Sequence, residues 1–116
     1  MQAWLTHVLR SFVYAWAGLV WALRTQRNLQ VHAVGAVCAT ITGLLLGWPA
    51  WKWALLAIIC GMVWTAELMN TAIEVLCDRV TREKDEAIRR VKDVAAGAVL
   101  AAAVAAVLAG LVLLVA

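Results

Sequence analysis

Three long stretches of this chain contain almost no charged side chain, and they constrain its fold more than any other feature. Residues 94–116 carry no charge at all, and residues 31–47 are apolar except for one histidine and two threonines. A further uncharged stretch covers residues 53–66 and continues as a helical pattern to Arg79. A helix needs about 17 to 25 predominantly apolar residues to cross a bilayer. The pattern therefore predicts an all-α integral membrane protein with three transmembrane helices.

The overall composition agrees with a membrane environment. Hydrophobic residues make up 66% of the 116 residues and charged residues 15%, whereas soluble domains carry about 25% charged residues. The mean hydropathy is +0.88, and a soluble domain this short could not bury so much apolar surface. The net charge of +3 does not indicate a nucleic acid partner, because no lysine and arginine patch alternates with stacking aromatic residues. Attraction to anionic lipid headgroups explains the basic charge.

The polar and apolar pattern also sets the boundaries expected within a single domain, residues 1–116. Residues 3–24 place apolar side chains three and four apart on one face and polar side chains on the other. This pattern predicts an amphipathic helix that lies on the membrane surface. The three spans are then expected at about residues 29–47, 51–79 and 91–115.

The connections between the spans indicate the orientation of the chain. Residues 48–53 form a tryptophan-rich turn, and tryptophan prefers the headgroup boundary. Residues 80–91 are rich in charge and are expected to be a solvated loop. Three lysines or arginines precede the first span, one lies in the tryptophan-rich turn, and six lie between Arg79 and Lys92. The positive-inside rule therefore predicts a cytoplasmic N-terminus and charged loop, with the C-terminus outside.

The last span carries a stripe of small residues. These residues lie four apart along the helix, at Gly97, Ala101, Ala105 and Ala109. Small residues let two membrane helices approach closely, so the stripe predicts close helix packing. Three thin helices bury little polar surface in one chain, and we therefore expect the protein to associate with copies of itself.

Polar residues interrupt the second span in a regular pattern. They are spaced three, four and four apart on one helical face, at Glu67, Asn70, Glu74 and Asp78. Glu67 follows the tryptophan-rich turn by about 14 residues, or about 21 Å, which places it within a hydrocarbon core of about 30 Å. Three carboxylates on one stripe repel one another, so a cation is expected beside them. Lys92 lies at the depth of Asp78, and Mg²⁺ prefers carboxylate ligands such as Glu74.

The residues alone leave several functions open. A metal ion, a lysine and surface carboxylates are parts used in phosphoryl transfer, and a further carboxylate in the lipid zone could take a proton from a hydroxyl. A small transporter would also carry a buried glutamate such as Glu67. A structural or pore-forming protein would use the same polar residues only to join its helices. His32 is interpreted as an interfacial anchor at the start of a span, and no Walker A loop, kinase Gly-rich loop or nucleophile elbow is present.

Several strings of residues resemble those of a known family, the small bacterial membrane lipid kinases that phosphorylate diacylglycerol or undecaprenol. The matching strings are Glu67–Glu74 with Asp78, Lys92–Val99, Tyr14–Gly18, and Arg27-Asn28 with His32. They extend over nearly the whole chain at the spacings expected for that family.

This resemblance implies an architecture and a reaction. The fold would be an amphipathic surface helix followed by three transmembrane helices, assembled as a homotrimer with sites between subunits in the bacterial inner membrane. The reaction would transfer the γ-phosphoryl group of ATP, with Mg²⁺, to a membrane lipid alcohol. The string Arg27-Asn28 with Val31-His32 is more similar to the undecaprenol kinase branch, so undecaprenol is the favoured acceptor and diacylglycerol the next.

The resemblance also implies roles for individual residues. Glu67 resembles the general base, which also contacts the lipid, and Asn70 resembles a positioning group beside it. Glu74 and Gln26 correspond to magnesium ligands. The residues that correspond to the ATP-binding set are Tyr14, Asp78, Glu83, Lys84, Asp85, Lys92 and Asp93. Those that correspond to the lipid-binding set, besides Glu67, are Arg10, Asn28 and Ala96.

Two positions depart from the family pattern. Gln26 stands where the family usually has a glutamate. The glutamine keeps one oxygen donor for the metal but lacks the negative charge of the glutamate. His7 stands where some members have an arginine that contacts the nucleotide, and Arg10 lies one turn further along the chain. The first departure is expected to weaken the affinity for metal.

Overall fold

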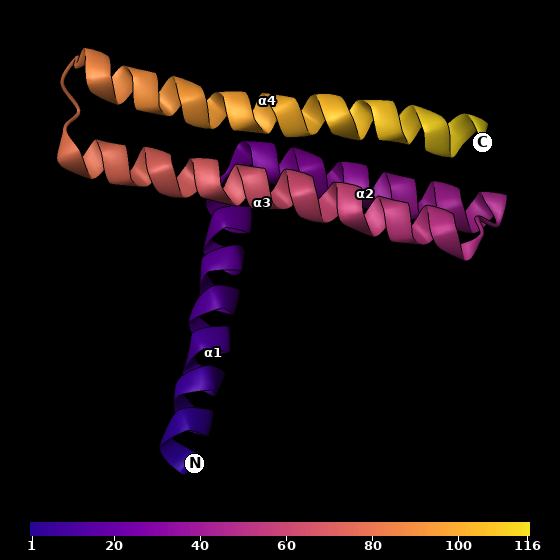
Figure 1. Cartoon of the computed structure of the whole chain (residues 1–116), viewed down its shortest axis with the longest axis horizontal. Helices are drawn as coiled ribbons and strands as arrows, with labels where there is room; N and C mark the ends of the chain where they lie inside the picture. The colour runs from indigo at the N-terminus through magenta and orange to yellow at the C-terminus, as the bar shows by residue number, and fades with distance from the viewer.

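The computed structural model describes the whole chain, residues 1–116, as four helices without a strand. These are α1 (Gln2–Thr25), α2 (Arg27–Leu46), α3 (Ala50–Val80) and α4 (Glu86–Val115). Helices α2, α3 and α4 lie along a common direction, whereas α1 points away across it (Figure 1). Helix α3 packs against both α2 and α4, which do not contact each other. The molecule is therefore organised around α3.

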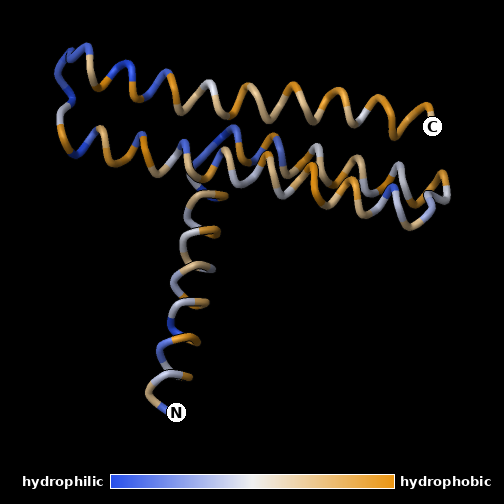
Figure 2. The backbone as a smooth tube through the Cα atoms, viewed as in Figure 1, coloured by the Kyte–Doolittle hydropathy of each residue, from blue (hydrophilic) through white to orange (hydrophobic).

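Three of the helices are long and apolar enough to cross a membrane, which confirms the number of spans expected. They are α2, α3 and α4. Helix α2 has 20 residues, which corresponds to about 30 Å and matches the hydrocarbon thickness of a bilayer. Helices α3 and α4 have 31 and 30 residues and extend further. Figure 2 shows hydrophilic residues gathered at the end where α3 joins α4, which we call the charged end.

Helix α1 is a continuous helix that contacts the other helices only near its own C-terminal end. Ala22 is its single buried residue, and the large side chains of Phe12 and Trp16 are exposed. The helix ends at Gln26, whose extended backbone turns the chain into α2. Nothing within the chain covers the first four turns of α1.

The charged stretch is helical over its second half, so the expectation of a loop at residues 80–91 is wrong from Glu86 onward. Asp85 caps the helix because its Oδ1 accepts a hydrogen bond from the backbone N–H of Ile88 at 3.0 Å. The acidic side chain of Glu86 in the first turn complements the positive end of the helix dipole. A sequence rich in charge is therefore compatible with a well-capped helix start.

The turn between α2 and α3 is fixed by two glycines and two tryptophans. Gly47 adopts a left-handed conformation with φ of 63°, and the backbone N–H of Trp48 donates to the carbonyl of Gly43 at 3.0 Å. The indole N–H of Trp53 donates to the carbonyl of Trp48 at 3.1 Å, and the two rings pack edge to face at 5.8 Å. Gly43 is buried beneath both rings. This packing sets the register of α2 against α3.

A buried lysine joins α3 to the end of α4. Lys52, expected in the tryptophan-rich turn, lies in the first turn of α3 and is 7% exposed. Its Nζ donates to the carbonyl oxygens of Leu113 at 3.0 Å and Ala116 at 2.7 Å, and the rings of Trp48 and Trp51 lie within 5.8 Å of it. A cation is favourable at this position because the last carbonyls of a helix lack partners and carry partial negative charge.

Little of the chain is buried, and the stripe of small residues in α4 does not pack within it. Only 12 of 116 residues are buried. Ala95 and Ala102 are the buried alanines of α4, whereas Gly97, Ala101 and Ala105 are exposed. The close packing expected from the stripe is therefore not made inside a single chain, because a different face of α4 meets α3.

Candidate active site

The polar stripe of α3 runs from the apolar interior of the helix bundle toward the charged end. Glu67 and Asn70 are buried, at 3% and 9% exposed. Glu74 is half-buried and Asp78 is exposed. The four residues extend over about 16 Å at about 1.5 Å per residue. The stripe therefore extends along one helix face from the buried carboxylate of Glu67 to the exposed carboxylate of Asp78.

Glu67 has one polar partner in the chain, and that partner is His32. The Nε2 atom of His32 lies 3.2 Å from Oε1 of Glu67, and the two side chains are 28% and 4% exposed. The histidine comes from the second turn of α2, so this contact joins two helices. The interpretation of His32 as an interfacial anchor did not include this contact with Glu67. The sequence signal that was missed is a second ionisable group at the start of the neighbouring span.

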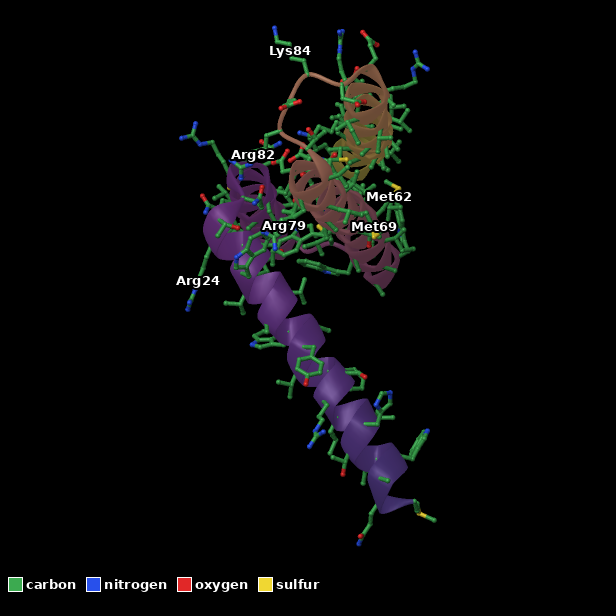
Figure 3. The ribbon with its side chains drawn as sticks, turned by 90° about the vertical axis from the view of Figure 1, so that its left-hand side faces the viewer. Arg24, Met62, Met69, Arg79, Arg82 and Lys84 are labelled. Carbon is green, nitrogen blue, oxygen red and sulfur yellow. The ribbon has the colours of Figure 1, made fainter.

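Asn70 contacts Glu74 and also borders an apolar groove. Its Nδ2 donates to Oε1 of Glu74 at 3.4 Å, whereas its Oδ1 is buried without a partner. The groove lies between α3 and α4, has a volume of about 630 Å³, and is lined mostly by small and apolar side chains. Figure 3 shows two of these, Met62 and Met69, on the flank of α3 that faces away from α1. The amide oxygen of Asn70 is thus a buried acceptor without a hydrogen-bond partner in the chain.

Asp78 and Lys92 form an ion pair between α3 and α4. The Nζ of Lys92 donates to Oδ1 of Asp78 at 2.6 Å, with side chains 37% and 43% exposed. Arg89 lies 3.8 Å from Asp93 on the same helix. The expected placement of Lys92 beside the carboxylate of Asp78 is therefore what the structure shows. A lysine held there is accessible to a water-soluble anion.

A polar cavity of about 560 Å³ lies at the charged end. Ile88 is its single hydrophobic lining residue. Six of the residues that the resemblance implies for ATP line it, namely Asp78, Glu83, Lys84, Asp85, Lys92 and Asp93. Figure 3 shows Lys84 at the outer tip of the loop. The chain therefore brings these six residues together in a cavity open to solvent.

The remaining expected site residues are not brought to this cavity by a single chain. Tyr14 is 71% exposed on α1, and α1 has no contact with α4. Arg10 lies one turn earlier on the same uncovered part of α1. Asn28 and Ala96 are exposed on α2 and α4. None of these four residues lines the polar cavity of its own chain.

The expected metal ligands are separate from each other in sequence and element. Glu74 lies on α3, and Gln26 lies at the break between α1 and α2, where its Nε2 donates to Oγ1 of Thr25 at 3.3 Å. No group of three or more His, Cys, Asp or Glu side chains that could hold a metal is present. In kinase sites Mg²⁺ is held by one or two carboxylates together with substrate phosphates. This donor set fits an ion that arrives with a nucleotide.

Comparison with known proteins identifies the family. A model of the prokaryotic diacylglycerol kinase family matches residues 13–114. An undecaprenol kinase of Bacillus subtilis is 35% identical over 89 residues, which are 77% of this chain and 72% of that protein. A diacylglycerol kinase of Synechocystis is 43% identical over 72 residues, which are 62% of this chain and 41% of that protein. The chain belongs to the prokaryotic diacylglycerol kinase family, a family of membrane lipid kinases. This membership does not favour the transporter alternative.

Proposed function

We propose that this protein transfers the γ-phosphoryl group of ATP, with Mg²⁺, to the hydroxyl of a membrane lipid alcohol. Undecaprenol is the preferred acceptor and diacylglycerol the next. The observation that carries this proposal is the polar stripe of α3, which leads from the buried Glu67 to the exposed pair Asp78–Lys92. One end suits a reactant dissolved in lipid, and the other suits a charged reactant dissolved in water.

The chemistry at the buried end is proton removal. Glu67 accepts the proton of the lipid hydroxyl as the hydroxyl oxygen forms its bond to the γ-phosphorus. The bond from the γ-phosphorus to the bridging oxygen of ATP breaks at the same time, and ADP leaves. The unpartnered amide oxygen of Asn70 supports a role in orienting the hydroxyl beside the base. A base of this kind contributes about 100- to 10,000-fold to the rate.

The chemistry at the charged end is nucleotide binding. The ammonium of Lys92 offsets the charge of the phosphates, and the other lining residues of the polar cavity position the nucleotide. Glu74, with Gln26, would hold Mg²⁺ together with the phosphate oxygens. The ion would neutralise the charge that develops on the transferred group. Glu74 suits this task because it lies one helical turn from both Asn70 and Asp78.

The assembly proposed is a homotrimer with α1 on the cytoplasmic surface of the bacterial inner membrane. The exposed apolar faces of the spans and the small-residue stripe of α4 support association, because a single chain leaves them uncovered. The distance of Tyr14 and Arg10 from the polar cavity of their own chain supports sites shared between subunits. The excess of lysine and arginine at the charged end supports a cytoplasmic N-terminus.

The preference for undecaprenol rests on the start of α2. The two relatives do not decide it, because one is an undecaprenol kinase at 35% identity and the other a diacylglycerol kinase at 43% identity. The string Arg27-Asn28 with His32 is similar to that of the undecaprenol kinase branch. The two acceptors differ in their tails, so a direct comparison decides between them.

The test is phosphate transfer from labelled ATP to each lipid in mixed micelles, with and without Mg²⁺. We expect a labelled phospholipid that forms only with Mg²⁺, with a higher kcat/KM for undecaprenol than for diacylglycerol. A higher kcat/KM for diacylglycerol would contradict the acceptor preference. Formation of no labelled lipid from either acceptor would contradict the kinase proposal.

A further inference from the structure

Glu67 is the least exposed charged residue of the chain, and its environment requires an explanation. It is 3% exposed, and its contact with His32 is its only hydrogen bond or ion pair within the chain. A buried carboxylate without a partner is costly, because it loses its hydration without compensation. The histidine is therefore well placed to stabilise this carboxylate.

We propose that His32 is a positioning residue of the lipid kinase reaction. Its Nε2–H donates to Oε1 of Glu67 and holds the carboxylate so that Oε2 accepts the proton of the lipid hydroxyl. This inference rests on the proposed function, and it assigns a role to a residue of α2 that belongs to neither the expected ATP-binding set nor the expected lipid-binding set. The imidazole acts through Glu67 alone.

The geometry supports this role in two ways. His32 and Glu67 come from different helices, and their contact at 3.2 Å restrains the carboxylate from outside its own helix. The packing of Gly43 against the rings of Trp48 and Trp53 fixes the register of the two helices, and Gly43 lies about 16 Å from His32 along α2, so the histidine meets Glu67 at a defined height. A base whose orientation is fixed by a third group is the general arrangement of an activated catalytic pair.

His32 also lines a cavity. The cavity lies between α2, α3 and α4, has a volume of about 580 Å³, and is lined mainly by apolar residues. The imidazole therefore has no other side-chain partner within the chain that competes with Glu67. Within the chain, the side chain of His32 forms its polar contact with the carboxylate of Glu67.

The competing explanation is that His32 only joins α2 to α3. A purely structural contact would lower thermal stability and would reduce the amount of active protein without changing the properties of the active fraction. A positioning contact lowers kcat, leaves KM for ATP unchanged because the nucleotide cavity is distant, and is restored by a side chain that donates from the same place. These readouts separate the two explanations.

The kinetic experiment compares His32→Gln with His32→Leu. The amide N–H₂ of glutamine reaches about as far as Nε2 and can donate, whereas leucine fills similar space without a donor. We expect His32→Leu to lower kcat by about 10- to 100-fold, the usual effect of removing a group that orients an active-site ligand. We expect His32→Gln to recover most of that loss. The control is Thr40→Val, since Thr40 is exposed on α2 and bonds only to Ala36 of its own helix.

Three results would overturn the role of His32. They are a kcat for His32→Leu equal to that of the wild type, a His32→Gln variant no more active than His32→Leu, and a KM for ATP raised in parallel with the loss of kcat. An inactive wild-type protein would overturn the proposed function and this role with it. An active wild type with a fully active His32→Leu variant would overturn the role of His32 alone.

A spectroscopic experiment tests the contact without any assay of activity. The chain has two histidines, His7 and His32, so the ¹⁵N spectrum of a sample labelled only at histidine imidazole nitrogens contains two sets of signals in detergent micelles, and His32→Gln assigns them. We expect Glu67→Gln to shift the His32 signals and to leave those of His7 in place. Unchanged His32 signals in Glu67→Gln would overturn the inference.

Discussion

Replacing Gly43 with alanine tests whether the tryptophan-rich turn fixes the register of α2 against α3. A Cβ at this position would lie 2.6 Å from Cε3 of Trp48 and 2.8 Å from Cη2 of Trp53, whereas carbon atoms prefer about 3.5 to 4.0 Å. Both rings, or the α2 backbone between them, must therefore move by about 1 Å to restore that separation. Neither moves freely, because the rings pack against each other and the Trp53 indole bonds to the backbone of Trp48.

The expected size of the effect is the balance of two opposing contributions. Overpacking costs about 1 to 3 kcal/mol, and the change from glycine to alanine within a helix returns about 0.5 to 1 kcal/mol. The difference lies between about 0 and 2.5 kcal/mol, and from the midpoints of the two ranges we expect Gly43→Ala to destabilise the protein by about 1 kcal/mol. The matched control is Gly35→Ala on the same helix, where nothing lies within 4 Å of the added Cβ. The control should be neutral or slightly stabilised.

The assay is thermal unfolding in detergent micelles, followed by circular dichroism for wild type and both variants. A Tm for Gly43→Ala below that of the wild type, with Gly35→Ala at or above it, agrees with the packing described. Equal Tm values for Gly43→Ala and Gly35→Ala would refute the reasoning, because they would show that the rings yield without cost.

Three further predictions concern other polar contacts. Lys52→Met removes two hydrogen bonds to the last carbonyls of α4 and should destabilise the fold by about 1.5 to 3 kcal/mol, measured by thermal unfolding; a Tm equal to that of the wild type would contradict the prediction. Lys92→Gln should raise KM for ATP by about 10- to 100-fold with little change in KM for lipid, since Lys92 lines the polar cavity proposed for the nucleotide; an equal rise in both constants would argue against that placement. Gln26→Glu adds a carboxylate and should lower the Mg²⁺ concentration needed for half-maximal activity; an unchanged Mg²⁺ titration would remove Gln26 from the metal site.

The number and limits of the long helices follow closely from the sequence, because hydropathy and length act locally. The uncharged residues 94–116 and the tryptophan-rich turn each determine an element without reference to the rest of the chain. Helix α4 begins at Glu86, within the stretch expected to be a charged loop, because a helix cap can start a helix in a sequence rich in charge. Asp85 ends the loop by bonding to the N–H of Ile88, which is a local signal that the sequence does contain.

The pairing of side chains across helices was only partly predictable. Spacing alone placed Glu67 and Asp78 on one face of α3, and equal depth suggested Lys92 as the partner of Asp78. The partner of Glu67 depends on the register between α2 and α3, which is set by how Gly43 packs under two rings. No periodicity in one helix contains that information, so the contact between His32 and Glu67 is not predictable from the sequence alone.

The face of α4 that meets α3 was also not readable from one sequence. Two faces of α4 are lined by small residues, one through Ala95 and Ala102 and one through Gly97 and Ala101. Both satisfy the pattern for close packing. The choice between them depends on the Lys52 contact at one end and the Asp78–Lys92 ion pair at the other, both of which are tertiary.

The most direct test of the central claim is the initial rate of phosphate transfer to undecaprenol by Glu67→Gln at saturating ATP, Mg²⁺ and lipid. The substitution keeps the shape of the side chain and its contact with His32 but removes the capacity to accept a proton. With Thr40→Val as the control and equal helix content verified by circular dichroism, the account predicts a rate lower by about 100- to 10,000-fold for Glu67→Gln and an unchanged rate for the control. A Glu67→Gln variant that transfers phosphate at the wild-type rate would contradict the account.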